Sequence, residues 1–242
     1  MKTWQENSGG TTNGSKLNYK CQYCNKLFRK ESVLAAHQCE PKRRALQEKE
    51  QGVQLGLRAW LRFYEITQGS ARTKSYVDFA ASQFYSAFVK FGRHLVAIRA
   101  VNPAAFIEYV IRQNKKLDYW THDAIYVEYL RQYLRRESAQ DALERSLVEM
   151  QEYTDESQQF NNFNEYFKQG NANRICQHIT NGRVSPWVVY NCSTGIEFLE
   201  QLNEEQIAMI LPWIDPDHWQ AKFKDYVADT EWVKMILKTA GL

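Results

Sequence analysis

The sequence predicts a mainly α-helical protein, in which a small unit at residues 19–40 precedes an all-α body. Apolar residues recur at intervals of three and four along most of the 242-residue chain, which is the period of an amphipathic helix. Signatures of helix starts also follow one another at short intervals from residue 75 onward. Alternating apolar and polar runs joined by hairpin turns are absent outside the small unit, so we expect no further sheet.

Composition places the chain among globular proteins of the cell interior. Hydrophobic residues make up 44% and aromatic residues 14%, which is enough to bury a core. We expect neither a membrane-spanning helix nor a signal peptide, because no run of about 18 apolar residues occurs. The five cysteines are an odd number, and three of them lie close together, which fits a reducing compartment better than disulfides. These features predict an intracellular, cytoplasmic protein.

Two polar segments flank the small unit. Residues 1–18 are rich in Gly, Ser, Thr and Asn without periodicity, and we expect a flexible lead-in. Residues 41–52 are expected to form a basic linker to the body at 53–242. Pro41 disfavours the helical region for Glu40, so we expect it to end the helix of the small unit.

The body is predicted to be a succession of capped helices. An apolar stripe runs from Val53 to Tyr64, a second runs from Ala80 to Ile98 behind a capping box, and a third holds Tyr126, Tyr129 and Tyr133. Residues 154–173 are rich in Asn and Gln, and we expect an irregular segment there that joins two subdomains. The expected helix starts are Ser75-x-x-Asp78, Asn102-Pro103, Ser138-x-x-Asp141, Ser185-Pro186, Thr194-x-x-Glu197, Asn203-x-x-Gln206 and Asp215-Pro216, and Gly241 is expected to stop the last helix.

Residues 19–39 carry three cysteines and one histidine at the spacing of metal ligands. Cys21 and Cys24 form a C-x2-C pair, and His37 and Cys39 follow after twelve residues. Two cysteines on a tight turn and a histidine on a short helix supply the thiolate and imidazole ligands that Zn²⁺ prefers. The alternative is that these residues pack in an ordinary core. We expect Cys21, Cys24, His37 and Cys39 to bind one Zn²⁺ ion.

Apolar residues in the same segment carry a family resemblance. Tyr19 lies two residues before the first cysteine, Phe28 four after the second, and Leu34 three before the histidine. With the ligands, this pattern resembles a C2H2-type zinc finger in a variant C2HC form. The resemblance implies a ββα fold for residues 19–40, with zinc as its cofactor.

The fourth ligand departs from the pattern of this family, which places it three to five residues after the histidine. Cys39 follows His37 by only two residues, and residues two apart on a helix point to opposite sides. The chain must therefore leave the helix at His37 for Cys39 to reach the metal. A non-local histidine or a water molecule is the alternative fourth ligand.

The finger is not expected to read a base sequence. The base-contacting positions of the family fall on Lys30, Val33 and Ala36, and the last two offer no bidentate hydrogen bonds. A single finger covers only about three base pairs, and single fingers also serve as protein-binding modules.

The net charge of +3 is unevenly distributed along the chain. Residues 1–136 carry 23 Lys and Arg against 11 Asp and Glu, whereas residues 137–242 carry 8 against 17. A basic half predicts a polyanionic partner, and an acidic half can contact another protein. The expected nucleic-acid contacts are Lys20, Lys26, Arg29, Lys30, Lys42, Arg43 and Arg44, and, as surface candidates in the body, Lys115, Lys116 and the stacking ring of Trp120. The alternative for the aromatic residues of the body is a core stripe with solvated arginines behind it.

Motifs of catalysis are absent, which favours a non-enzymatic protein. The chain has no Walker loop, G-x-G-x-x-G, H-E-x-x-H or G-x-S-x-G. Two further metal sites are weaker hypotheses than capping and core packing, namely Asp215, Asp217 and His218, and Cys176, His178 and Cys192.

We interpret the chain as a zinc-finger nucleic-acid-associated protein, binding DNA or RNA with weak sequence preference in a replication, transcription or packaging assembly. Its acidic half would contact another protein of that assembly. The alternatives are a protein-binding adaptor or structural protein, and a nucleic-acid-processing enzyme with an unrecognised site. The whole chain also faintly resembles uncharacterised proteins of T4-like tailed bacteriophages, in which such a finger precedes a helical body, and this implies the host cytoplasm as its location.

Overall fold

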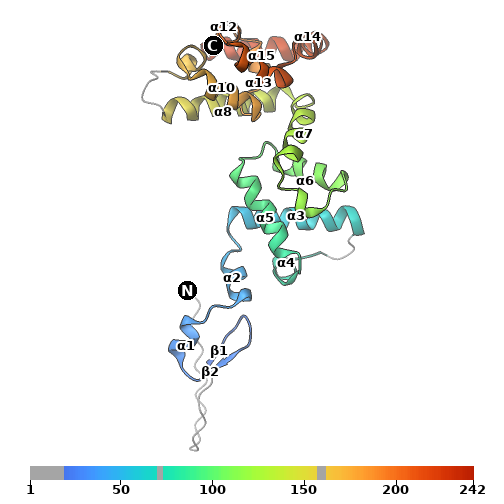
Figure 1. The fold of residues 1–242 in the computed structure, drawn as a ribbon, viewed down its shortest axis with the longest axis vertical. Helices are drawn as coiled ribbons and strands as arrows, with labels where there is room; N and C mark the ends of the chain where they lie inside the picture. The colour runs from blue at the N-terminus through green and yellow to red at the C-terminus, as the bar shows by residue number, and fades with distance from the viewer. Residues whose placement is uncertain (1–18, 70–72, 157–161) are drawn as a thin grey trace, which may run out of the picture. The chain divides into compact units, whose positions relative to one another are not determined.

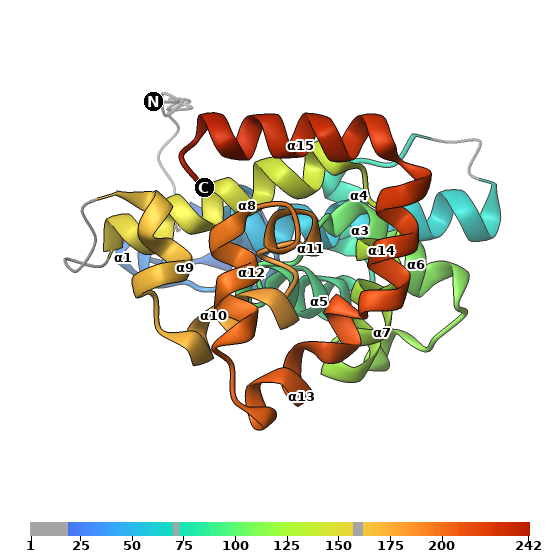
Figure 2. The same ribbon diagram turned by 90° about the horizontal axis from the view of Figure 1, so that it is seen from above.

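The structure is a computed structural model that describes residues 19–69, 73–156 and 162–242 (Figure 1 and Figure 2). It is mainly helical, and the only strands in the described ranges form a two-stranded antiparallel sheet near the start, which confirms the predicted fold class. The chain forms two compact units, one ending at Val96 and the other beginning at Ala97. No helix within the described ranges combines the length and apolar character that a membrane span requires.

The small unit has the predicted ββα order. Strand β1 (Tyr19–Lys20) pairs with β2 (Leu27–Phe28), with Tyr19 opposite Phe28, and helix α1 (Glu31–Ala36) packs on both strands. Asn25 lies in the connection at φ 62°, a left-handed conformation that asparagine tolerates better than most residues. The predicted lead-in at 1–18 lies outside the described residues.

Helices of the first unit follow the small sheet. They are α2 (Glu40–Leu46), α3 (Gln51–Gln68), α4 (Tyr76–Ala81) and α5 (Tyr85–Ala97). Helices α3 and α5 cross in direct backbone contact (Figure 1), because a Cβ added to Gly92 would lie 2.0 Å from the carbonyl oxygen of Gly52. It would also lie 2.4 Å from the amide nitrogen of Gly56. Glycine at these positions is therefore what lets the two helices meet.

The second unit is built around the long helix α8. Figure 2 shows α15 running alongside α8, and α9 and α11 also contact α8. Its elements are α6 (Pro103–Arg112), η1 (Leu117–Tyr119), α7 (Asp123–Leu134), α8 (Ala139–Glu156), η2 (Phe163–Glu165), α9 (Tyr166–Gln169), α10 (Ala172–Thr180), α11 (Pro186–Val189), α12 (Ser193–Glu200), α13 (Glu204–Ile214), α14 (Pro216–Asp225) and α15 (Val227–Thr239).

Most predicted helix starts are confirmed by side-chain caps. Complete capping boxes occur at Ser75 with Asp78 and at Asn203 with Gln206. Caps also accept hydrogen bonds at Asn102, Ser138, Ser185 and Asp215.

Three expectations about the helices after residue 75 are wrong. The single helix expected over Ala80–Ile98 is two helices, because Ser82 takes an extended conformation (φ −66°, ψ 141°) between α4 and α5. Helix α12 begins at Ser193 behind Cys192, so Thr194 is not its cap. The segment 154–173 is not irregular in its described part, since it holds the end of α8, η2 and α9. It lies inside the second unit, and the division into finger, linker and body stays a prediction.

A buried histidine makes the stability of the second unit depend on pH. The His178 ring lies in the core, where its Nδ1 is 2.7 Å from the Tyr166 hydroxyl and its Nε2 is 3.8 Å from Glu149 Oε1. Burial, with a contribution from the nearby arginines, lowers the pKa of His178 from 6.5 to about 4. Between pH 6.5 and pH 4, His178 therefore binds a proton in the unfolded chain but not in the folded unit.

We expect His178 to cost the second unit about 3 kcal/mol of stability between pH 6.5 and pH 4, and nothing above this range. The sign follows from the lowered pKa of His178, because the unfolded state binds the proton first as the pH falls. Urea unfolding of the wild type and of His178→Gln at pH 7 and pH 4 measures the effect. The variant should show a smaller pH dependence, and equal dependence in the two proteins would contradict the assignment.

Candidate metal centre

A tight turn places the two cysteines of the C-x2-C pair on one side of the finger. The backbone N–H of Cys21 donates to the Lys26 carbonyl at 2.9 Å, and the N–H of Asn25 donates to the Cys21 carbonyl at 2.9 Å. These bonds close the turn between β1 and β2. Because Asn25 accepts the left-handed conformation, the turn closes without a glycine.

His37 and Cys39 lie on an extended segment between two helices. Helix α1 ends at Ala36, and both His37 (φ −66°, ψ 122°) and Cys39 (φ −129°, ψ 157°) are extended, as the predicted early exit from the helix requires. The expected role of Pro41 is wrong. Pro41 lies in the first turn of α2 with Glu40, where a helix needs no N–H donor, so it begins a helix and does not end one.

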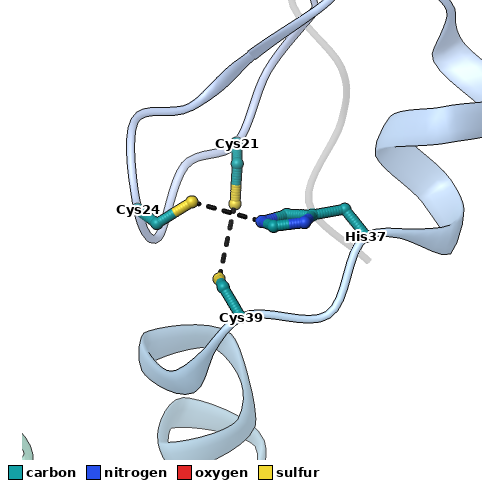
Figure 3. A group of neighbouring side chains, drawn as sticks. All are labelled: Cys21, Cys24, His37 and Cys39. Carbon is teal, nitrogen blue, oxygen red and sulfur yellow. Dashed lines mark hydrogen bonds between the residues drawn. The ribbon is translucent and has the colours of Figure 1, made fainter.

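The four donor atoms lie close enough together to surround one metal ion. All lie within 4.8 Å of one another, with 3.9 Å between Cys21 Sγ and Cys39 Sγ and 3.2 Å between Cys24 Sγ and His37 Nε2 (Figure 3). Zinc–sulfur bonds of about 2.3 Å and zinc–nitrogen bonds of about 2.0 Å at tetrahedral angles imply about 3.8 Å between sulfurs and about 3.5 Å from sulfur to nitrogen. The three thiols and the imidazole are therefore compatible with a zinc site, and Cys39 lies close enough to the other three residues to be a fourth ligand.

Neighbouring groups shape the chemistry of the ligands. The pKa of the Cys21 thiol is lowered, chiefly by a hydrogen bond from the backbone N–H of Cys24, whereas burial raises the pKa of Cys39. The ring of Phe28 lies 4.7 Å from the ring of His37 and orients it. Lys42 Nζ donates to the His37 carbonyl at 3.1 Å and holds the segment between the last two ligands.

The basic residues on and after the finger differ in their freedom to bind a ligand. Lys20, Lys26, Arg29, Lys30 and Arg43 are exposed, and Lys42 is half-buried.

Arg44 is held inside the first unit, since its side chain is only 18% exposed and its guanidinium donates to the Ala80 carbonyl at 2.6 Å. It also lies over the Tyr85 ring at 4.4 Å and donates to Glu40. Arg44 therefore has a structural role that the sequence did not indicate.

Trp120 and Tyr129 belong to the core of the second unit. Lys115 and Lys116 are exposed, but Trp120 is only 1% exposed and donates from Nε1 to the Lys115 carbonyl at 2.9 Å. The expectation of a stacking ring at the surface is therefore wrong for Trp120, because the ring fills the core and its one polar group is satisfied. Tyr129 is also buried, and its hydroxyl donates to the Val101 carbonyl at 3.0 Å, as a core stripe would predict.

The two weaker metal hypotheses find no support among the described residues. In this part of the chain, Cys21, Cys24, His37 and Cys39 are the only group of three or more potential ligands that meet. The Asp215 carboxylate accepts the backbone N–H of His218 as a helix cap. Burial raises the thiol pKa values of Cys176 and Cys192, as expected for inert core cysteines.

Comparison with known proteins identified no relative. A scan against protein-family models, a search of curated proteins and a search of solved structures each found no match. The resemblances to the C2H2 fingers and to the phage proteins therefore stay predictions, and the site is argued from its own geometry.

Proposed function

We propose that the four-ligand centre binds one Zn²⁺ ion and that the finger it holds together binds nucleic acid with weak sequence preference. The observation that carries this proposal is the approach of three thiols and one imidazole to within 4.8 Å of one another. We place this activity in a replication, transcription or packaging assembly. The thiol ligands need a reducing environment, so the cytoplasm is the proposed location.

Zinc would be the structural core of the finger. Among residues 19–51, all of which the structure describes, Cys21 alone is buried. A segment with so little buried apolar surface cannot offset the entropy of folding without a metal. Zinc has no redox role at such a site, and what it supplies is the fixed placement of the side chains around it.

The charge of the first unit supports a polyanionic partner. Residues 1–96 carry 16 Lys and Arg against 7 Asp and Glu, and the remaining residues carry 15 against 21. Exposed lysine and arginine side chains on the finger can neutralise phosphates without reading bases. The acidic second unit is then left to contact a protein of the same assembly.

Weak sequence preference follows from the outer face of α1. Val33 is 49% exposed and Ala36 is exposed, and neither side chain can donate or accept a hydrogen bond at a base edge. Lys30 is the only base-edge donor among the three positions that the family uses for reading.

We expect the joint replacement of Lys26, Arg29 and Lys30 by Ala to weaken binding to all DNA sequences alike. Each lost phosphate contact lowers the salt slope of the binding constant by about 0.9, so the slope should fall by up to about 3. Fluorescence anisotropy with several unrelated duplexes over a range of salt concentrations measures both effects. Joint replacement of Lys168, Lys224 and Lys238, which are exposed on the second unit, is the control of equal charge and should change little. A wild-type protein that binds no DNA or RNA at low salt would refute the proposal.

A protein-binding adaptor is the second candidate. It is favoured by the apolar side chains that the finger exposes, since Leu27 is 58% and Val33 49% exposed. An adaptor would show no salt-dependent nucleic-acid binding, and its captured partners would survive nuclease treatment. The same titration therefore separates the two candidates.

A further inference from the structure

A groove lies beside the metal centre on the finger. Its volume is about 460 Å³, within the range of about 300–1,000 Å³ typical of pockets that hold small molecules. Tyr19 and Tyr23 line it from β1 and the cysteine turn, and Leu34 and Ala35 line it from α1. The groove therefore joins aromatic rings and an apolar helix face in one concave surface.

The charged side chains that line the groove carry a net positive charge. Lys20 and Lys42 also line the groove, and Glu31 is its one carboxylate. Lys42 Nζ uses one of its three protons on the His37 carbonyl, so two others remain for an anion. Flat rings next to ammonium groups are what single-stranded nucleic acid needs, because its bases stack on aromatic side chains while its phosphates pair with cations.

A double helix cannot use such a groove. In a duplex the faces of the bases are covered by their neighbours, and only base edges are accessible in the grooves of the helix. A tyrosine ring in a concavity can stack only on a base that has left the helix. The face of α1 that would read base edges carries Val33 and Ala36, so the finger is better suited to base faces than to base edges.

We infer that this groove binds an unstacked base of single-stranded nucleic acid, with Tyr23 as the stacking ring and Lys20 and Lys42 on the adjoining phosphates. The inference rests on the proposed function and specifies the form of its ligand. A peptide with an apolar side chain is the competing occupant. Residues 19–44 carry seven Lys and Arg against two Glu, which together with the tyrosine rings favours a polyanion with flat rings.

The test compares single-stranded and duplex binding by the zinc-loaded full-length protein. The probes are labelled 20-mers of dT and of rU and a 20-base-pair duplex, at low salt. Tyr23→Leu should weaken binding to a single strand roughly tenfold, since aromatic stacking contributes about fivefold to a hundredfold per base. Tyr23→Phe keeps the ring and should stay within about twofold of wild type, and duplex affinity should not change in either variant. If Tyr23→Leu binds dT more weakly, the ligand is DNA, and if it binds rU more weakly, the ligand is RNA. Either result, or both, supports binding of a base in the groove.

A second pair of variants keeps the test decisive if Tyr23→Leu loses zinc. Ala35 and Ala36 are neighbours on α1 and both are exposed, but only Ala35 lines the groove. Ala35→Glu places a carboxylate in the groove and should weaken single-strand binding at least tenfold, whereas Ala36→Glu adds the same charge outside it and should have a smaller effect.

Two outcomes overturn the inference in different ways. A wild type that binds single strands, with no loss in Tyr23→Leu and equal effects of the two glutamates, leaves nucleic-acid binding in place and shows that the base does not bind in the groove. A wild type that binds none of the three probes refutes the proposed function together with the groove.

Discussion

Removal of zinc should unfold residues 19–39 and leave the secondary structure of the second unit in place. Structural zinc contributes about 10–16 kcal/mol to the folding of small finger peptides, far more than the apolar contacts of this segment can replace. Because the thiols must lose their protons to bind the metal, affinity should also fall on acidification. Elemental analysis should find one zinc per chain, and amide hydrogen exchange with and without a chelator should show loss of protection at residues 19–39.

Cys39→Ser tests the fourth ligand in the same assays. We expect this variant to bind zinc far more weakly than the wild type, because the Cys39 Sγ, which lies 3.9 Å from the Cys21 Sγ, is the proposed fourth ligand. Gln38→Ser is the matched control, since Gln38 is exposed between the last two ligands and should keep its zinc. Undiminished zinc binding by Cys39→Ser would assign the fourth position to a non-local histidine or to water.

Gly92→Ala should destabilise the first unit by about 3 kcal/mol or more. Alanine is favoured over glycine in a helix by about 1 kcal/mol, so propensity alone would predict a gain in stability. The added Cβ would lie 2.0 Å from the Gly52 carbonyl oxygen and 2.4 Å from the Gly56 nitrogen, and no side-chain rotation can relieve a clash with backbone. The two helices must therefore separate and lose their packing.

Denaturant unfolding of the full chain, followed by tryptophan fluorescence, measures this loss. Ser86→Ala lies on the same helix at an exposed position and should raise stability by a few tenths of a kcal/mol through propensity. A Gly92→Ala variant as stable as the wild type would show that the α3–α5 contact is looser than the structure indicates.

The sequence predicted helix caps and ligand spacing correctly because both depend on residues that are close together in the chain. A helix cap joins a side chain to a backbone group three residues away, and the boxes at Ser75 and Asn203 form as predicted. The ligand spacing correctly predicted that the four side chains lie close together, because a tight turn and a short helix set most of the finger geometry. Only the reason for the early helix exit was wrong, because Pro41 belongs to the following helix.

Features that depend on contacts between distant segments could not be predicted from patterns in the sequence. The contact of Gly92 with Gly52 joins residues forty positions apart, and nothing in either helix alone indicates it. Trp120 lies among charged neighbours in the chain, yet the fold buries it. The role of Arg44 likewise depends on the Ala80 carbonyl, which only the tertiary structure brings near.

No linker separates the finger from the helices of the first unit, because Cys39 lies directly before α2. The residue is at once the last proposed ligand and the residue before the first turn of α2, and Arg44 on α2 anchors that helix to the carbonyl of Ala80 in α4. If a long flexible linker followed the finger, metal binding would not affect the stability of the helices after it. Here, we expect loss of the ion to release the start of α2 and to destabilise that helix, so the metal stabilises more of the first unit than the finger alone.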